Sequence, residues 1–452
     1  MSKAFSGTVG FISLGCQKNL VDSETMLGRL AEEGYVITAD HEHADVVVIN
    51  TCGFLEASRD ESLDTIKRTV KLKANGDVQR VVVAGCMVGK YKDMLLDEVP
   101  QVDAMISVND RETLSALLGD LRTSGELRQR ITDPDERGTV YDDRGRFRLT
   151  PRHYAYLRIS EGCDHTCSFC IIPQIRGKHR SKTPERILEE ARELAADGAK
   201  ELIIIAQDTT FYGLDLYGEK RIASLLRMLT REVDGVEWIR LMYAYPNQVT
   251  DTLVETMASE PKILPYIDMP LQHINTNVLK RMRRGGSRGM IEGWIERFRR
   301  AIPNFCLRST FIAGFPGETK EEHQELVEWV KAGWVDRLGC FAYSPERESH
   351  SATLDGHLGD GERLDRQQAV MEAAQAALFK ANEKLVGTRQ RVLIDGPSQD
   401  ERFPYAGRRY ADAPEVDCQV FVASENPLKP GDFVEVKIEK TLGYDLLARV
   451  SA

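Results

Sequence analysis

Three cysteines, Cys163, Cys167 and Cys170, lie within eight residues of one another. Closely spaced thiolates hold either zinc or an iron–sulfur cluster. Structural zinc needs four ligands, and the only further candidate inside this loop is His165, so zinc is disfavoured. A four-iron cluster held by three thiolates keeps an open coordination position on one iron. The spacing therefore predicts a cluster whose open iron binds a chelating substrate and passes it an electron.

A second set of three cysteines, Cys16, Cys52 and Cys86, follows three short apolar segments. The carboxyl ends of parallel strands lie along one edge of a sheet, so these three thiols can converge. A buried cysteine is also an ordinary small apolar residue, and this alternative explains any one of the three. The spacing alone leaves both interpretations open. If a second cluster forms, its open iron would bind a sulfur species readily.

The elements around these strand-end cysteines alternate between strand and helix. We expect strands at residues 8–16, 44–52 and 78–86 and helices at residues 19–34 and 60–76. Valine and isoleucine runs separated by helices predict a parallel α/β sheet domain over residues 1–120. Residues 121–150 are charged and contain few large apolar side chains, which predicts a linker.

The rest of the chain predicts two further domains. Over residues 151–384, six strand-like segments alternate with helices, which predicts an open, partial (βα)6 barrel. Active sites of such folds lie at the carboxyl ends of the strands, where the loop of residues 163–170 is expected. Residues 385–452 change to short strands with glycine and proline turns. This pattern predicts a small antiparallel β-barrel of the oligonucleotide-binding type.

Composition narrows the class of protein. The formal net charge of −10 argues against binding nucleic acid through the charge of the whole chain. We find no apolar run long enough to span a membrane and no signal peptide, so we expect a cytoplasmic protein that does not bind membranes. Nine cysteines in such a chain suit a reducing compartment.

The segments "SLGCQKNLVDSE", "NTCGF" and "GC", followed by "SEGCDHTCSFCIIPQIRGKHRSK", resemble the radical S-adenosylmethionine (SAM) methylthiotransferases, with a TRAM domain at the end. The resemblance implies two 4Fe–4S clusters, one on each set of cysteines, and a sulfide or polysulfide sulfur source. One SAM would methylate sulfur held at the N-terminal cluster. A second would bind the cluster of the 163–170 loop and yield a deoxyadenosyl radical. An external electron donor such as flavodoxin or ferredoxin is also implied.

The family divides by substrate into a branch that modifies tRNA adenosine and a branch that modifies an aspartate β-carbon in the twelfth small-subunit ribosomal protein. Lys18 in "CQKN", the segment "DMPLQH" at residues 268–273 and the segment "AQDTTFYGLDLYG" resemble the protein-modifying branch. From Leu385 onward, nine Lys and Arg residues oppose eleven Asp and Glu residues, whereas a tRNA-binding domain should be basic. A tRNA substrate is the alternative, and a two-cluster redox or sensor protein is a further one.

Several strand-end residues are candidates for SAM contacts. Gln207 and Asp208 end the second barrel strand, where they can bind the SAM amino group, although a helix N-cap at Asp208 explains them equally well. Gly314 ends the fifth strand and lets the backbone approach a ligand closely, or simply forms a strand-to-helix turn. Tyr243 and Gln272 end the third and fourth strands, where they line the cavity or belong to the barrel core.

Three other features lie around the expected active site. Phe169 directly precedes the last cysteine of the 163–170 loop and is a further cofactor-binding candidate. The basic runs at residues 176–182 and 280–289 flank the expected barrel mouth. One of their arginines can orient a substrate carboxylate, and contact with ribosomal RNA also stays open. The loop at residues 346–360 departs from the pattern of the family, so its role at the barrel mouth is not predicted.

Overall fold

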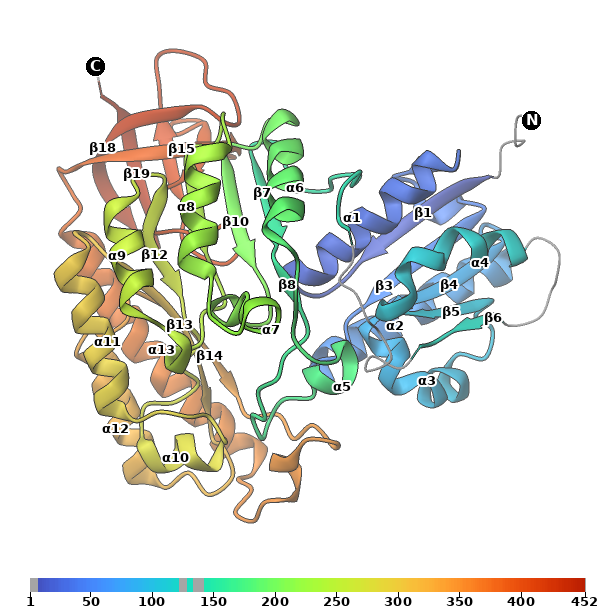
Figure 1. The fold of residues 1–452 in the computed structure, drawn as a ribbon, viewed down its shortest axis with the longest axis horizontal. Coiled ribbons are helices and arrows are strands. Elements are labelled where there is room, and N and C mark those ends of the chain that lie inside the picture. The colour runs from blue at the N-terminus through green and yellow to red at the C-terminus, as the bar shows by residue number, and fades with distance from the viewer. Residues whose placement is uncertain (1–6, 122–127, 133–141, 452) are drawn as a thin grey trace.

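The computed structural model describes residues 7–121, 128–132 and 142–451, which form three bodies (Figure 1). The first body is a parallel six-stranded sheet with the order β2-β1-β3-β4-β5-β6. Its strands are β1 (Thr8–Ser13), β2 (Val36–Thr38), β3 (Val46–Thr51), β4 (Arg80–Gly85), β5 (Ala104–Ser107) and β6 (Arg128–Arg130). Its helices are α1 (Gln17–Glu32), α2 (Glu56–Asn75), α3 (Cys86–Glu98) and α4 (Leu114–Leu121).

Helices cover both faces of this sheet because successive apolar residues of a strand point to opposite sides. Val47 and Ile49 pack in the same core as Ile66 of α2. Val48 packs on the other side, with Met26 of α1 and Leu117 of α4. The buried parallel sheet expected from the valine and isoleucine runs is therefore present.

The segment at residues 121–150, which we expected as a linker, is folded where the structure describes it. Residues 128–130 form the edge strand β6, paired with β5. Asp143 is buried, and the backbone N–H of Phe147 donates to the carbonyl of Glu24 in α1. The expectation for residues 122–127 and 133–141 falls outside the described residues.

The second body is a six-stranded parallel sheet with the order β14-β13-β12-β11-β10-β7, and its edge strands β7 and β14 leave the barrel open. Its strands are β7 (Tyr154–Arg158), β10 (Glu201–Ile205), β11 (Trp238–Leu241), β12 (Ile263–Asp268), β13 (Cys306–Ala313) and β14 (Arg337–Ala342). The helices outside it are α6 (Pro184–Ala196), α8 (Ile222–Glu232), α9 (Asp251–Ser259), α10 (Thr276–Arg281), α11 (Arg288–Ala301), α12 (Lys320–Lys331) and α13 (Asp360–Glu383). The expected (βα)6 partial barrel is confirmed.

The third body is a closed five-stranded barrel with the order β15-β16-β17-β19-β18. Its strands are β15 (Arg389–Pro397), β16 (Tyr405–Arg408), β17 (Val420–Ala423), β18 (Phe433–Leu442) and β19 (Asp445–Val450). The pairs are antiparallel, as expected, except that β17 and β19 pair in parallel. Sequence analysis did not predict β16, which is only four residues long and lies among glycine, proline and charged residues.

The terminal barrel lies against the beginnings of the second body's strands, opposite the cysteine loop (Figure 1). Arg408 pairs with Glu201, the first residue of β10, at 2.7 Å. Between β16 and β17, Ala411 and Ala413 pack with Tyr156 and Tyr266 of the open barrel. Among the described residues, no helix is both long enough and apolar enough to cross a lipid bilayer.

Candidate functional site

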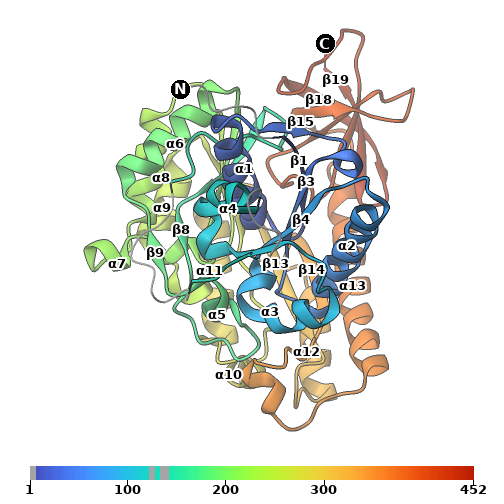
Figure 2. The same cartoon turned by 90° about the vertical axis from the view of Figure 1, so that its right-hand side faces the viewer.

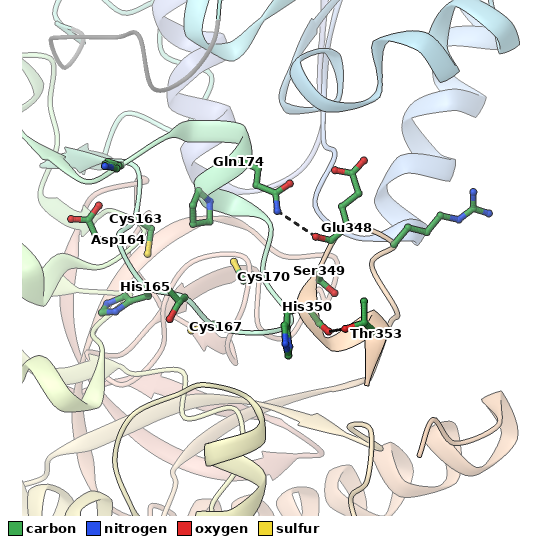
Figure 3. A pocket seen from close by; sticks show the side chains of 14 residues that line it. Cys163, Asp164, His165, Cys167, Cys170, Gln174, Glu348, Ser349, His350 and Thr353 are labelled. Atoms are coloured by element: carbon green, nitrogen blue, oxygen red, sulfur yellow. Dashed lines mark hydrogen bonds between the residues drawn. The ribbon is translucent and has the colours of Figure 1, made fainter. Parts of the chain in front are cut away.

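The cysteines of the 163–170 loop, Cys163, Cys167 and Cys170, lie where β7 leads through the short strand β8 (Ser160–Glu161) to the carboxyl end of the open barrel. All three line one pocket of about 690 Å³. Figure 3 shows the cysteine loop on one side of this pocket and residues 348–350 on the other. The loop therefore presents three thiols to a cavity that can hold a small molecule.

Backbone contacts hold this loop in place. Gly162 has φ +79°, and a Cβ on it would lie 2.0 Å from the carbonyl oxygen of Lys178, so only glycine fits there. The Cys163 N–H donates to the carbonyl of Gly177 at 3.1 Å. Ser168 donates from its backbone N–H to the carbonyl of Met282 at 2.8 Å.

Polar and aromatic side chains surround Cys167. The Arg284 guanidinium lies over the Tyr245 ring at 4.1 Å and 3.7 Å from the Cys167 Sγ. His165 stacks on the same ring, with 3.8 Å between ring centroids, and its Nε2 lies 2.6 Å from Asp208. A cation beside a sulfur ligand offsets thiolate charge, so Arg284 suits a thiolate at Cys167.

The strand-end cysteines also converge. Cys16 precedes α1, Cys52 directly follows β3 and Cys86 begins α3, and the three strands β1, β3 and β4 are neighbours in the sheet. A Cβ on Gly15 would lie 3.2 Å from the Cys52 Sγ. A Cβ on Gly53 would lie 2.9 Å from the Met87 Cα, next to Cys86. Glycines thus let the three cysteine-bearing loops approach one another.

Asn19 and Arg176 contact the cysteine at the start of α3. The Asn19 side chain donates to the carbonyl of Leu14 at 2.6 Å, and its Oδ1 lies 3.9 Å from the Cys86 Sγ. Arg176, in α5 (Ile172–Arg176), donates to the same sulfur at 3.2 Å. Arg176 follows Cys170 by six residues, so the segment after the cysteine loop reaches one of the strand-end cysteines.

Arg176 belongs to a buried ionic network that joins the first two bodies. It donates to Asp22 of α1 and to Glu161 of β8, both at 2.9 Å. Arg158 also pairs with these two carboxylates, at 2.5 and 2.7 Å. Burial alone would raise the pKa of Glu161, but Arg176 and Arg158 outweigh it and hold that pKa below its usual value. The basic run at residues 176–182 is therefore partly an interior feature, because Lys182 is also buried and pairs with Asp143.

The donor chemistry fits iron–sulfur clusters, although the thiols are not arranged as ligands in this conformation. Burial raises the pKa of Cys86, Cys163 and Cys170 to about 12, so these thiols are protonated at neutral pH without metal. Within residues 7–121, 128–132 and 142–451, no three His, Cys, Asp or Glu side chains are placed to hold a metal ion. Metal binding would deprotonate the thiols and turn them toward the metal.

Comparison with known proteins identifies the family. Residues 8–107 match the "Uncharacterized protein family UPF0004", residues 157–330 match the Radical SAM superfamily and residues 386–450 match the TRAM domain. A relative named ribosomal protein uS12 methylthiotransferase RimO, from Symbiobacterium thermophilum, is 43% identical over 98% of this chain and 91% of its own length. The chain belongs to the RimO family. A relative of the same name from Caldanaerobacter subterraneus subsp. tengcongensis is 44% identical over 97% of this chain and 99% of its own length.

A solved structure agrees on the fold. The radical SAM methyltransferase TsrM from Kitasatospora setae, with a tryptophan substrate and a SAM analogue, aligns with a TM-score of 0.56 at 13% identity. The alignment covers 75% of this chain and 74% of TsrM. The relatives and the matched domains confirm the expected resemblance to the radical-SAM methylthiotransferases. As a member of the RimO family with a Radical SAM domain, the chain is a SAM-dependent transferase.

Two of the SAM-contact candidates carry buried oxygens without a partner. Gln207 donates from Nε2 to Glu161 at 2.8 Å, and its Oε1 has no hydrogen-bond partner among the described residues. The Oε1 of Gln272 is likewise buried and unpartnered within the described chain, and Gln272 has φ +70°. An unsatisfied buried acceptor is costly, so both amides suit a site that a ligand completes.

Three other candidates have structural partners. Asp208 caps the turn Thr209–Phe211 by accepting from the Thr210 N–H at 2.8 Å, in line with the N-cap alternative. A Cβ on Gly314 would lie 2.8 Å from Arg363 of α13, so its close approach is to that helix. Phe169 packs with Met282 and other apolar residues and anchors the cysteine loop. The 690 Å³ pocket is lined by none of the candidates for SAM contacts, namely Phe169, Gln207, Asp208, Tyr243, Gln272 and Gly314.

The atypical loop lies at the barrel mouth, as expected for residues 346–360. Arg347, Ser349 and His350 line the pocket of the 163–170 loop. Glu346 is buried and pairs with Arg59 of α2. The loop therefore connects the first body to the wall of the pocket.

Proposed function

We propose that this chain adds a methylthio group to the β-carbon of an aspartate in ribosomal protein uS12 and consumes two molecules of SAM per turnover. The observation that carries the proposal is the junction of the two sets of cysteines. Arg176, six residues after Cys170, donates to the Cys86 sulfur of the other set at 3.2 Å.

Each set of cysteines has its own role in this proposal. Cys163, Cys167 and Cys170 hold the cluster that binds SAM at the carboxyl end of the open barrel. When bound, that cofactor supplies the radical that removes hydrogen from an unactivated carbon. The strand-end cysteines, Cys16 and Cys52 together with Cys86, hold a second 4Fe–4S cluster that presents sulfide or polysulfide sulfur.

The side chains at the strand ends orient SAM. Gln207 is held by Glu161, so its free Oε1 has a fixed direction and can accept from the SAM amino group. Gln272 offers a second fixed acceptor from the end of β12. Tyr243 lies next to the strand-end cysteines, because its hydroxyl donates at 2.5 Å to Gln17, the residue after Cys16.

A protein substrate is favoured over tRNA by the charge of the terminal domain. The stretch from Leu385 onward is acidic, which suits a basic ribosomal protein better than RNA phosphates. The enzyme then works in the cytoplasm with an external electron donor such as flavodoxin or ferredoxin. Local contact with ribosomal RNA would come from the exposed part of the basic run at residues 280–289, since residue 283 is exposed.

The test is a substrate comparison under anaerobic conditions. Reconstituted protein is incubated with SAM, sulfide and a reductant, with either uS12 or total tRNA, and each substrate is analysed by mass spectrometry. We expect one added methylthio group on uS12, located to an aspartate by peptide fragmentation. Modified adenosine in tRNA with unmodified uS12 would show that the alternative is correct. Cleavage of SAM without modification of either substrate would favour the redox or sensor interpretation.

A further inference from the structure

A buried lysine next to the strand-end cysteines has no anionic partner in the part of the chain that the structure describes. Lys18, two residues after Cys16, has only 8% of its surface exposed. Its Nζ lies 3.0 Å from the centroid of the Tyr243 ring. Among the described residues, its ammonium makes neither a hydrogen bond nor an ion pair within 4 Å. A buried charge without a counter-ion is costly, so this arrangement needs a reason.

The carboxylates that face Lys18 are already paired. Charges near its ammonium come from Cys16, Arg176, Asp268 and Glu161. Asp268 accepts from Arg308 at 2.8 Å. Glu161 is held between Arg158 and Arg176. Moving either carboxylate to Lys18 would break an ion pair that it already makes with an arginine.

The aromatic ring under the ammonium is fixed by contacts on both sides. Tyr243 lies two residues after the carboxyl end of β11 and has φ +60°, which is unfavourable for a side chain of this size. Its backbone N–H donates to Asp268 at 3.2 Å, and its hydroxyl donates to Gln17 at 2.5 Å. The ring therefore holds the Lys18 ammonium between the strand-end cysteines and the open barrel.

We propose that the Lys18 ammonium, held over the Tyr243 ring, binds the side-chain carboxylate of the substrate aspartate. This inference rests on the proposed function. The carboxylate of aspartate is bonded directly to its β-carbon, so fixing the carboxylate places the carbon that loses hydrogen. An ammonium–carboxylate hydrogen bond is strong in a buried site, and no carboxylate among the described residues forms one with Lys18. The site thus selects aspartate over its neutral isostere, asparagine.

The test compares binding of two forms of uS12, one with the target aspartate and one with asparagine in its place. Binding is measured with anaerobically reconstituted wild-type enzyme and with Lys18→Met, Lys18→Arg and Lys67→Met. Methionine keeps the length of the side chain without the charge, and arginine keeps the charge. Lys67 is a control on the exposed face of α2, where it pairs only with Glu98.

We expect Lys18→Met to weaken binding of the aspartate form roughly tenfold or more, because a hydrogen bond to a charged group is lost. Its affinity for the asparagine form should not change, so the variant no longer distinguishes the two. Lys18→Arg should recover part of the preference, and Lys67→Met should behave as wild type. A Lys18→Met enzyme that prefers aspartate as strongly as wild type would overturn the inference.

Measuring the iron content of the variants distinguishes substrate binding by Lys18 from a role in stabilising a cluster. If Lys18 only balanced the charge of a cluster at Cys16, Lys18→Met would lose iron and bind both forms of uS12 with unchanged preference. That result would also overturn the inference. Failure of the proposed function looks different, because the wild-type enzyme itself would then leave uS12 unmodified.

Discussion

A few buried side chains hold the first two bodies together and so fix the position of one set of cysteines relative to the other. Arg176 is the clearest case, because its guanidinium is buried and contacts a carboxylate from each of the first two bodies as well as the Cys86 sulfur. The sequence displayed it only as part of a basic run, "RGKHRSK", which usually marks a solvated surface. Its partners Asp22 and Glu161 lie far from it in the chain, so no local pattern could reveal the network.

Replacing Arg176 by glutamine should lower the free energy of unfolding by about 3–5 kcal/mol, since two buried carboxylates lose a partner. Urea denaturation of the metal-free protein measures this change. Arg144→Gln is the control, because its partners lie on the surface and such ion pairs contribute at most about 1 kcal/mol. An equal, small loss in both variants would contradict the assigned role of Arg176.

The buried imidazole of His273 should make the stability of the protein depend on pH. Its imidazole is fully buried and its Nδ1 accepts from the Asn275 N–H at 2.9 Å. Burial lowers the pKa of His273 from 6.5 to about 4, so the unfolded chain binds this proton more readily than the folded protein. Stability from this group is complete above pH 6.5 and is lost as pH falls toward 4, by about 3 kcal/mol in total.

His273→Asn tests that dependence, because the asparagine Oδ1 can accept from the same N–H without gaining a proton. Chemical denaturation at several values of pH gives the free energy of unfolding of both proteins. The variant should lose less stability than wild type between pH 6.5 and pH 4. Parallel curves would show that His273 does not carry the acid sensitivity.

Among the helices and strands, those that follow from a repeating pattern of apolar residues could be predicted from the sequence. Apolar runs such as "DVVVINTC" gave the parallel strands, and the position of Cys52 after one of them gave the shared sheet edge. Short elements were missed, because β6 and β16 are three and four residues long and depend on neighbours distant in the chain. The partners of Phe169 and Gly314 also depend on tertiary packing, which no local spacing records.

The pocket-lining loop at residues 346–353 gives a prediction for one element. Glu346 accepts from the Glu56 N–H at 3.2 Å and pairs with Arg59, so Glu346→Gln should loosen the loop. We expect hydrogen exchange of the Ser349 and Ser351 amides to speed up roughly tenfold. Glu348→Gln, on the same loop but with a half-exposed pair to Lys90, should change exchange little. Equal effects of the two changes would argue against Glu346 as the anchor.

At the scale of the whole molecule, charged contacts join all three bodies. The terminal barrel touches the open barrel through pairs such as Arg337 with Asp412 and Arg308 with Asp417. Domain order and approximate boundaries followed from the changes in pattern along the chain. The docking of the bodies was not predicted, because their interfaces combine charged and apolar residues that lie far apart in the sequence.

Removing the terminal barrel should therefore destabilise the rest of the protein. A chain ending at residue 386 would expose Tyr156 and Tyr266 on the inner face of the open barrel. We expect a lower Tm and aggregation, measured by differential scanning fluorimetry and light scattering. An unchanged Tm would mean that this domain serves substrate binding alone.

We propose that each set of cysteines holds its own 4Fe–4S cluster. The most direct measurement is iron and sulfide content, with Mössbauer spectra, of anaerobically reconstituted wild-type protein and of two triple alanine variants. We expect about eight iron atoms per wild-type chain and about four in each variant, one without the cysteines at 16, 52 and 86 and one without those at 163, 167 and 170. A wild-type chain with about four iron atoms, all lost in one variant and kept in the other, would contradict the account.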